Sequence, residues 1–189
     1  GPTSLSVSVG RVEQGREPLY RYHKISVSQD FLLQRGLLSL GASFEDQTTQ
    51  STSRADAKVV ETRAAVLWQA PNGGLWRGTL VSRKTRSFLT TETFDEVQAS
   101  ASLTPSWRIL GTVPTVTLGL GSKDFDDFIL SFDGRRDRIA SLGLSLRLDT
   151  ISFMGFSPVL NISGTRTRSN IARYDIDEVK ANLGLQSQF

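Results

Sequence analysis

Apolar and polar residues alternate along most of this chain with a period of two, the period of a β-strand whose two faces differ. The pattern is clearest in one segment, whose consecutive residues are Leu142, Gly143, Leu144, Ser145, Leu146, Arg147, Leu148 and Asp149. It returns in residues 179–189, which end on Phe189. An amphipathic strand at this position is unusual in a water-soluble domain, where the last residues normally fray into solvent.

Counting such segments predicts ten strands and no helix. They cover or are centred on residues 5–9, 23–28, 38–45, 60–69, 75–86, 97–104, 116–121, 142–149, 160–165 and 179–189. The fifth segment has no clear phase, because apolar and basic residues mix on both faces. Between the fourth and fifth segments, Asn72 and Gly73 predict a tight hairpin turn with positive φ at both central positions.

The predicted links alternate in length: those after the second, fourth, sixth and eighth strands are short, and the others are longer and polar. Outer-membrane barrels have this asymmetry. The polar phase of most strands holds Ser, Thr, Gly, Asn and Gln with scattered charges, which fits a wet lumen better than a packed core. We therefore expect residues 1–189 to form one all-β domain, an antiparallel up-and-down transmembrane β-barrel of about ten strands in a bacterial outer membrane.

The same phases predict which side chains meet lipid and which meet water. The candidates for lining the lumen are Lys180, Arg147, Asp149, Arg63 and Glu61. Aromatic residues near predicted strand ends would form the interfacial girdles of such a barrel, and they are Trp68, Trp76, Trp107, Phe153 and Phe156. Ordinary core aromatics are the alternative interpretation.

Composition narrows the function classes. A hydrophobic content of 38% without a long apolar run excludes a helical membrane protein, since a spanning helix needs about 20 apolar residues. The absence of cysteine excludes disulfides, zinc knuckles and thiol catalysis. A net charge of +3, with both signs abundant and no basic stripe, gives no sign of a nucleic-acid partner.

No constellation of residues predicts an enzyme, a cofactor or a metal site. Asp124, Asp126 and Asp127 lack the spacing of a calcium loop, so a solvated loop is the better interpretation. His23, the single histidine, has no nucleophile motif beside it. A basic rim is conceivable from Arg135, Arg136, Arg138, Arg166 and Arg168, although exposed loop charge is the simpler interpretation.

The last third of the chain carries four motifs: Gly-Phe-Ser-Pro at 155–158, Ser-Asn-Ile at 169–171, Tyr-Asp-Ile-Asp at 174–177 and the amphipathic strand that ends at Phe189. With these motifs it resembles the end of the surface lipoprotein assembly modifier (Slam) family. The resemblance implies an outer-membrane barrel that helps to move lipoproteins or secreted proteins to the cell surface. Family members are similar to a periplasmic helical-repeat domain followed by a barrel of about fourteen strands, so this chain resembles the C-terminal part of such a barrel, or a shortened relative.

Three hypotheses follow. The first is a translocation barrel in outer-membrane lipid, whose last strand is recognised by the barrel-assembly machinery through Phe189, Leu185 and Leu183, and which carries a lipoprotein or secreted protein. The second is a passive pore or scaffold barrel. The third is a soluble barrel that binds an apolar ligand inside.

Overall fold

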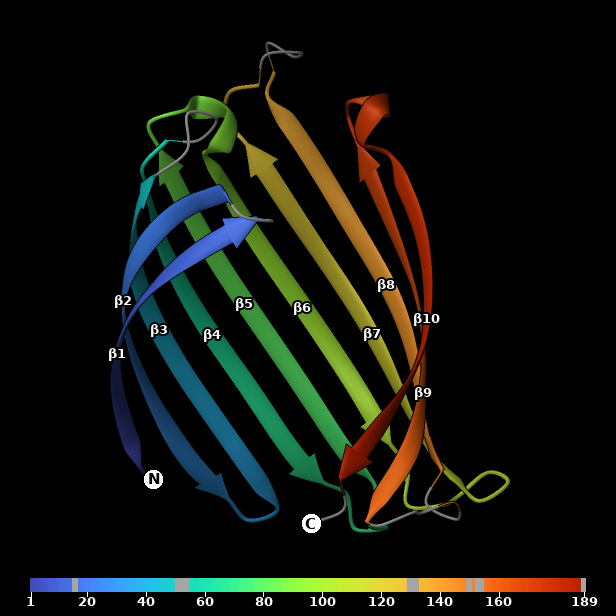
Figure 1. The fold of residues 1–189 in the computed structure, drawn as a ribbon. Helices are drawn as coiled ribbons and strands as arrows, with labels where there is room; N and C mark the ends of the chain where they lie inside the picture. The colour runs from blue at the N-terminus through green and yellow to red at the C-terminus, as the bar shows by residue number, and fades with distance from the viewer. Residues whose placement is uncertain (15–16, 50–54, 129–132, 149–150, 152–154, 188–189) are drawn as a thin grey trace.

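The computed structural model describes residues 1–14, 17–49, 55–128, 133–148, 151 and 155–187. Ten antiparallel strands follow one another in a single sheet, each paired with its neighbours in the sequence (Figure 1). The strands are β1 (Thr3–Gln14), β2 (Glu17–Leu33), β3 (Gly36–Thr49), β4 (Ala57–Gln69), β5 (Leu75–Ser87), β6 (Phe94–Thr104), β7 (Thr112–Phe125), β8 (Arg135–Leu148), β9 (Phe156–Ser169) and β10 (Ile176–Ser187). The predicted all-β, up-and-down architecture of ten strands is confirmed.

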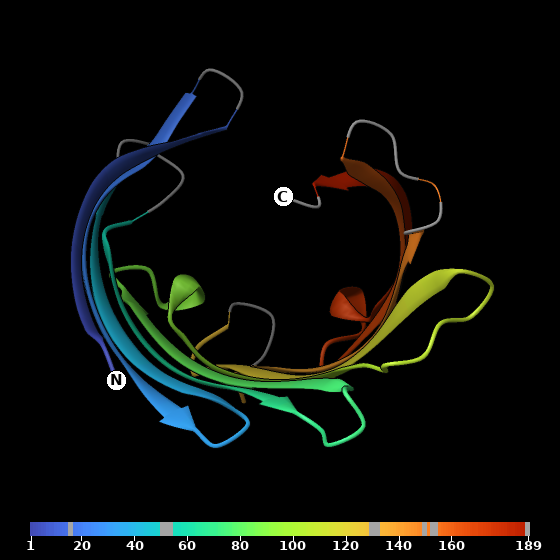
Figure 2. The ribbon, with the colours of Figure 1, turned by 90° about the horizontal axis from the view of Figure 1, so that it is seen from below.

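The sheet curls around an axis but does not close. Figure 2, which looks along that axis, shows the wall interrupted between β1 and β10. Each of these two strands has a single paired neighbour, β2 and β9 respectively. A barrel closed at ten strands by pairing of residues 5–9 with the last strand is therefore not formed.

Two one-turn 3-10 helices lie at one end of the curl. They are η1 (Thr90–Glu92), between β5 and β6, and η2 (Ala172–Tyr174), between β9 and β10. Figure 2 shows both inside the ring of strands. The face that they approach is therefore the concave face of the sheet, and this end of the molecule is called the η end below.

The strands are longer than the sequence pattern predicts. The prediction that short and long links alternate is wrong. The connections contain two to nine residues at the η end and two to seven residues at the other end. Polar segments that suggest loops continue as strand: β3 extends to Thr49, and β8 begins at Arg135. Both faces of the sheet meet water near this end, so polarity there does not distinguish a strand from a loop.

The hairpin between β4 and β5 lies where it is predicted but uses a different turn. Gly73 donates its backbone N–H to the Ala70 carbonyl, and Ala70 donates to the carbonyl of Gly74. Gly73 has a φ of 85°, whereas Asn72 has a negative φ. A turn followed by one left-handed residue is the usual three-residue hairpin loop. The expectation of positive φ at both positions is therefore wrong.

The fold has almost no apolar interior. Among the described residues, the buried hydrophobic side chains are Ala57, Phe125 and Val159. Large apolar side chains lie instead on the convex face, where Leu5, Leu183 and Val179 are 72%, 75% and 81% exposed. The convex face is therefore apolar and the concave face is polar.

We predict that Gly134→Ala destabilises the fold and that Gly184→Ala does not. Gly134 has a φ of 72°, and a Cβ atom there would lie 2.3 Å from the Phe125 carbonyl oxygen. The left-handed conformation alone costs a residue with a Cβ about 1–2 kcal/mol. Gly184 lies in β10 with nothing within 4 Å of an added Cβ. The free energy of unfolding in denaturant should fall by about 1 kcal/mol or more for the first variant only. Equal stabilities would contradict this reading of the β7–β8 turn.

Candidate functional site

A row of charges with alternating sign crosses the concave wall near the η end. The backbone register places these residues directly opposite one another on five adjacent strands, in the order Glu61, Arg83, Glu96, Lys123 and Asp137. Each interior member of this charge row has an opposite charge on both sides. Opposite charges in directly facing positions stabilise neighbouring strands.

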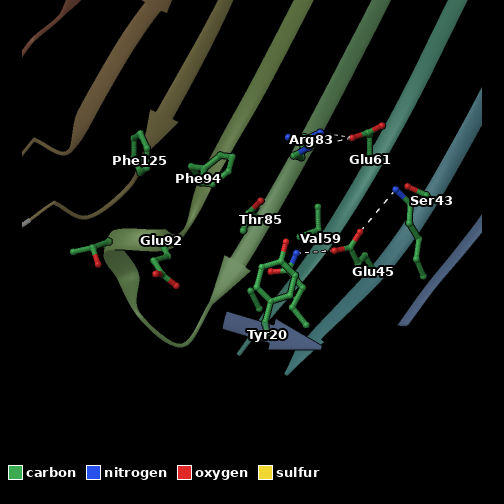
Figure 3. Close-up of a pocket in the computed structure, with 14 residues that line it drawn as sticks. Tyr20, Ser43, Glu45, Val59, Glu61, Arg83, Thr85, Glu92, Phe94 and Phe125 are labelled. Carbon is green, nitrogen blue, oxygen red and sulfur yellow. Dashed lines mark hydrogen bonds and ion pairs between the residues drawn. The ribbon is translucent and has the colours of Figure 1, made fainter. Parts of the chain in front are cut away.

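Two carboxylates share one guanidinium at the centre of the charge row. Arg83 Nη2 lies 2.7 Å from Glu61 Oε2, and Arg83 Nη1 lies 3.6 Å from Glu96 Oε2. The Arg83 Nε atom also donates to Glu61 Oε2 at 3.1 Å. Farther along the wall, Lys24 Nζ lies 3.8 Å from Glu45 Oε2. Figure 3 shows Glu45, Glu61 and Arg83 on neighbouring strands, lining one cavity.

Aromatic rings pack against Lys123 of the charge row and against the neighbouring Arg135. Lys123 Nζ lies 3.6 Å from the ring centroid of Phe94, and Phe94 packs on Phe125 with the centroids 5.4 Å apart. The guanidinium carbon of Arg135 lies 3.5 Å from the ring centroid of Tyr174 in η2. Cation–π contacts of this kind are worth more where the cation has lost water. They tie the η2 turn to the inner wall.

Asp137 is the most deeply buried charged residue described, with 3% of its surface exposed. Its two carboxylate oxygens accept from Arg135, Oδ1 from Nε at 2.9 Å and Oδ2 from Nη2 at 2.5 Å. This two-point contact satisfies the carboxylate, as a buried charge requires. Arg135, expected on an exposed rim, therefore turns inward, which corrects that expectation.

The concave wall encloses a cavity of about 550 Å³ beside the charge row. Tyr20, Lys24, Glu45 and Glu61 come to it from β2, β3 and β4, and Glu92 comes from η1 (Figure 3). The walls of the cavity are polar, because charged side chains of both signs line it together with aromatic rings. This lining differs from that of an apolar ligand pocket.

The predicted lumen-lining residues fall on the concave phase of the sheet where they are described. Glu61 lines the cavity directly. Arg63 lies two residues along β4 on the same face, Arg147 has that phase on β8, and Lys180 has it on β10, with its Nζ atom 2.8 Å from Glu178 Oε2. Asp149 lies outside the described residues. The role of these side chains in a lumen stays a prediction.

The described part of the predicted assembly signal lies on β10, the last strand of the sheet. Leu183 and Leu185 project from the convex face of β10, the strand with one unpaired side. Phe189 lies outside the described residues. Recognition of this segment by an assembly machinery stays a prediction.

Of the predicted girdle, Trp68 and Trp76 face each other across β4 and β5 at the end opposite the η turns, both on the convex phase. Trp107 and Phe156 are exposed near the same end. Phe153 lies outside the described residues. Their placement at one level is the arrangement that an interfacial girdle requires.

Sequence reasoning missed most of the charge row. Successive members among Arg83, Glu96, Lys123 and Asp137 are separated by 13 to 27 residues along the chain. The strand register brings them side by side in space. Alternation alone shows which face a residue takes but not which residues stand opposite it. A search for opposite charges at mirrored distances from each hairpin would have found Glu61 and Arg83, which flank the turn at 70–74.

Two further features, a metal site and a membrane-spanning helix, are not found in the described part of the chain. Residues 1–14, 17–49, 55–128, 133–148, 151 and 155–187 contain no group of three acidic, histidine or cysteine side chains placed to hold a metal ion. No described helix is long and apolar enough to cross a membrane. Comparison of the chain with protein-family models, curated proteins and solved structures finds no match.

We predict that Asp137→Ala destabilises the fold by about 2–4 kcal/mol, close to the loss caused by breaking a buried ion pair. The substitution leaves Arg135 without its two-point partner and Lys123 with an opposite charge on one side only, that of Glu96. Glu178→Ala removes the Glu178–Lys180 pair, which is exposed, and should change the free energy of unfolding by less than about 0.5 kcal/mol. Denaturant unfolding measures both variants. Similar small losses would show that the Asp137 pair is not structural.

Proposed function

We propose that this chain forms the wall of an outer-membrane β-barrel that assists the passage of lipoproteins or secreted proteins to the cell surface. The observation that carries the membrane part is the inverted distribution of side chains: apolar on the convex face, polar on the concave face. That inversion is the rule for barrels whose outside is lipid and whose inside is water.

The exposed surface supports an apolar environment. The accessible surface is 12947 Å² for 20.8 kDa. A water-soluble folded protein of that mass exposes about 8,900 Å². The excess exists because the sheet is one layer thick and its apolar side chains have no second layer to pack on. Lipid chains would cover them.

The convex face has the vertical order of a membrane wall. On β4 the apolar stretch runs from Val60 to Trp68, about 26 Å along the strand. At a tilt of roughly 35–45° this crosses about 20 Å, most of the apolar band of about 25 Å. Tryptophans bound it below, and charged pairs such as Arg86–Asp95, 2.6 Å apart, bound it above.

Two features favour protein passage. The C-terminal third carries the Gly-Phe-Ser-Pro, Ser-Asn-Ile and Tyr-Asp-Ile-Asp motifs that resemble the Slam family. The sheet also has an open side between β1 and β10 (Figure 2), through which an extended chain could exchange between the concave side and the membrane. Main-chain hydrogen bonds at such an edge bind extended segments.

A passive pore is the second candidate, and the charge row favours it. Glu61, Arg83, Glu96 and Lys123 place fixed charges of both signs on the inner wall. Rings of charged side chains set ion preference in water-filled pores. A soluble barrel around an apolar ligand is disfavoured, because its apolar face would have to be the concave one.

We predict that spin labels on neighbouring residues of β8 report opposite environments. The chain has no cysteine, so Leu144→Cys and Ser145→Cys each give a single labelling site. In vesicles the label at 144, on the convex phase, should be relaxed by oxygen, and the label at 145 by a water-soluble nickel complex. The opposite result would reverse the assignment of the faces. A chain that is folded and monodisperse in plain buffer would refute the membrane proposal.

We predict that bulky residues on the concave wall block transport. Ser100→Trp with Gly143→Trp narrows the concave side, and Gly143 leaves ordinary contact distance for a Cβ, 3.7 Å to Thr117. Ala99→Trp with Leu144→Trp adds the same rings to the convex face as a control. Display of a reporter lipoprotein on cells, measured by its protease accessibility, should fall severalfold for the first pair only.

Single-channel conductance of the same variants separates the two candidate functions. A conductance that falls with the concave pair while display stays at wild-type level would favour the passive pore and contradict transport. Loss of display with no measurable conductance in any variant would support transport.

A further inference from the structure

A cluster of arginines lies on the convex face of β8 and β9 near the η end, and its members are not part of the charge row. Arg138 of β8 stands directly opposite Arg168 of β9, and Arg166 lies two residues farther along β9, opposite Ala140. Arg136 precedes them on β8 on the same face. Like charges in directly facing positions are destabilising unless an anion compensates them.

The carboxylates nearby compensate this arginine cluster only in part. Asp177 lies 3.5 Å from Arg168 Nη2 and 3.6 Å from Arg166 Nε, and Asp175 lies 3.6 Å from Arg168 Nη1. Arg138 forms no ion pair with any described residue. Arg136 stands opposite Asp124 of β7 and lines a hollow with Asp126 and Asp133. The positive charge that stays uncompensated on this exposed surface is therefore that of Arg138, which faces Arg168.

An apolar hollow of about 540 Å³ opens on the convex face immediately below the arginine cluster. It exists because Ala140 and Gly164 are small where their neighbours are large: Leu120, Leu142 and Val179 form its walls. A Cβ atom added at Gly164 would meet nothing within 4 Å. Arg166 and Asp177 lie at its upper end. The hollow thus leads from the apolar band up to the guanidinium groups.

We propose that this surface, the arginine cluster with the hollow below it, binds one phosphorylated lipid, with a phosphate on Arg138 and Arg168 and an acyl chain along Gly164 and Ala140. The proposal rests on the membrane location proposed above. Arginine forks match phosphate oxygens in two-point contacts, and a lipid in the leaflet at the η end presents its headgroup at the level of the cluster. The lipid to which the proposal commits is lipid A, whose phosphates and acyl chains match the guanidinium groups and the apolar hollow respectively.

The same wall offers a matched control. Arg11 and Arg21 also face each other, on β1 and β2, on the convex phase and near the same end of the sheet. Arg11 is already paired with Glu13, and the hollow described above is lined by residues of β7 to β10, far along the sheet from this pair. Removing these two charges changes the protein's net charge as much as removing Arg138 and Arg168 does.

Native mass spectrometry of the refolded protein in zwitterionic detergent, titrated with diphosphoryl lipid A, tests the proposal. Wild type should bind one lipid. Arg138→Gln with Arg168→Gln should weaken binding by about tenfold or more, the effect of losing charge-assisted contacts. Gly164→Leu, whose added Cβ atom meets nothing within 4 Å, places an apolar side chain in the hollow and should weaken binding severalfold. Arg11→Gln with Arg21→Gln should bind as wild type does.

Competing outcomes would overturn it. Equal affinities in all four proteins, no bound lipid in wild type, or full displacement by inorganic phosphate would each refute the lipid site. All proteins must show the same β-sheet circular dichroism, and lipid A lacking its phosphates should bind no better than the arginine variants do. A protein that folds in detergent but binds no lipid refutes this inference alone, whereas folding in plain buffer refutes the membrane location.

Discussion

The single-layer construction of the sheet is the constraint on which the rest of the structure depends. Neighbouring strands are joined by continuous backbone ladders, and within the described residues no second sheet covers either face, while η1 and η2 lie against the concave face only at its η end. The apolar convex side chains, Leu5 and Val179 among them, stay exposed, and leaving apolar area in water forgoes about 25 cal/mol for every Å². Backbone pairing alone gives a small net gain per hydrogen bond. The proposed surroundings, apolar outside and aqueous inside, would remove this cost, because the side chains alternate between an apolar convex face and a polar concave face.

The same constraint applies to the two edges. The outer sides of β1 and β10 carry unpaired N–H and C=O groups, which are costly in lipid. Both edges keep the phase of the wall, with Val7 and Leu183 outward and Ser6 and Asn182 inward. A strand that pairs with either edge must therefore have the same alternation. Because β1 and β10 run in opposite directions, any strands that complete an up-and-down ring between them must be even in number.

The period-two pattern was enough to predict the number and order of the strands and which residues lie on each face. It is informative because successive side chains of a strand point to opposite faces, so a strand with one apolar and one polar face has an alternating sequence. Residues 142–148 show this directly, with leucines on the convex face and Gly143 and Ser145 opposite. The pattern failed at the strand ends, where Thr49 and Arg135 continue a strand in polar surroundings on both faces. It also could not predict the charge row, because partners such as Glu96 and Lys123 are set by register, which the hairpins fix one after another. Closure depends on contacts between the first and last strands, which no local pattern encodes.

Register also separates charges that hold the wall together from charges that are open to a ligand. In the charge row every interior residue has an opposite sign on each side, so Arg83 between Glu61 and Glu96 is already compensated, and the aromatic contact of Lys123 adds to this. On the convex face, the register sets Arg138 against Arg168 and leaves Arg138 without an ion pair among the described residues. The inner pattern lowers the energy of the folded sheet by itself. The contact between Arg138 and Arg168 is a like-charge contact that a bound anion would relieve, which is the electrostatic difference between a structural network and a binding surface.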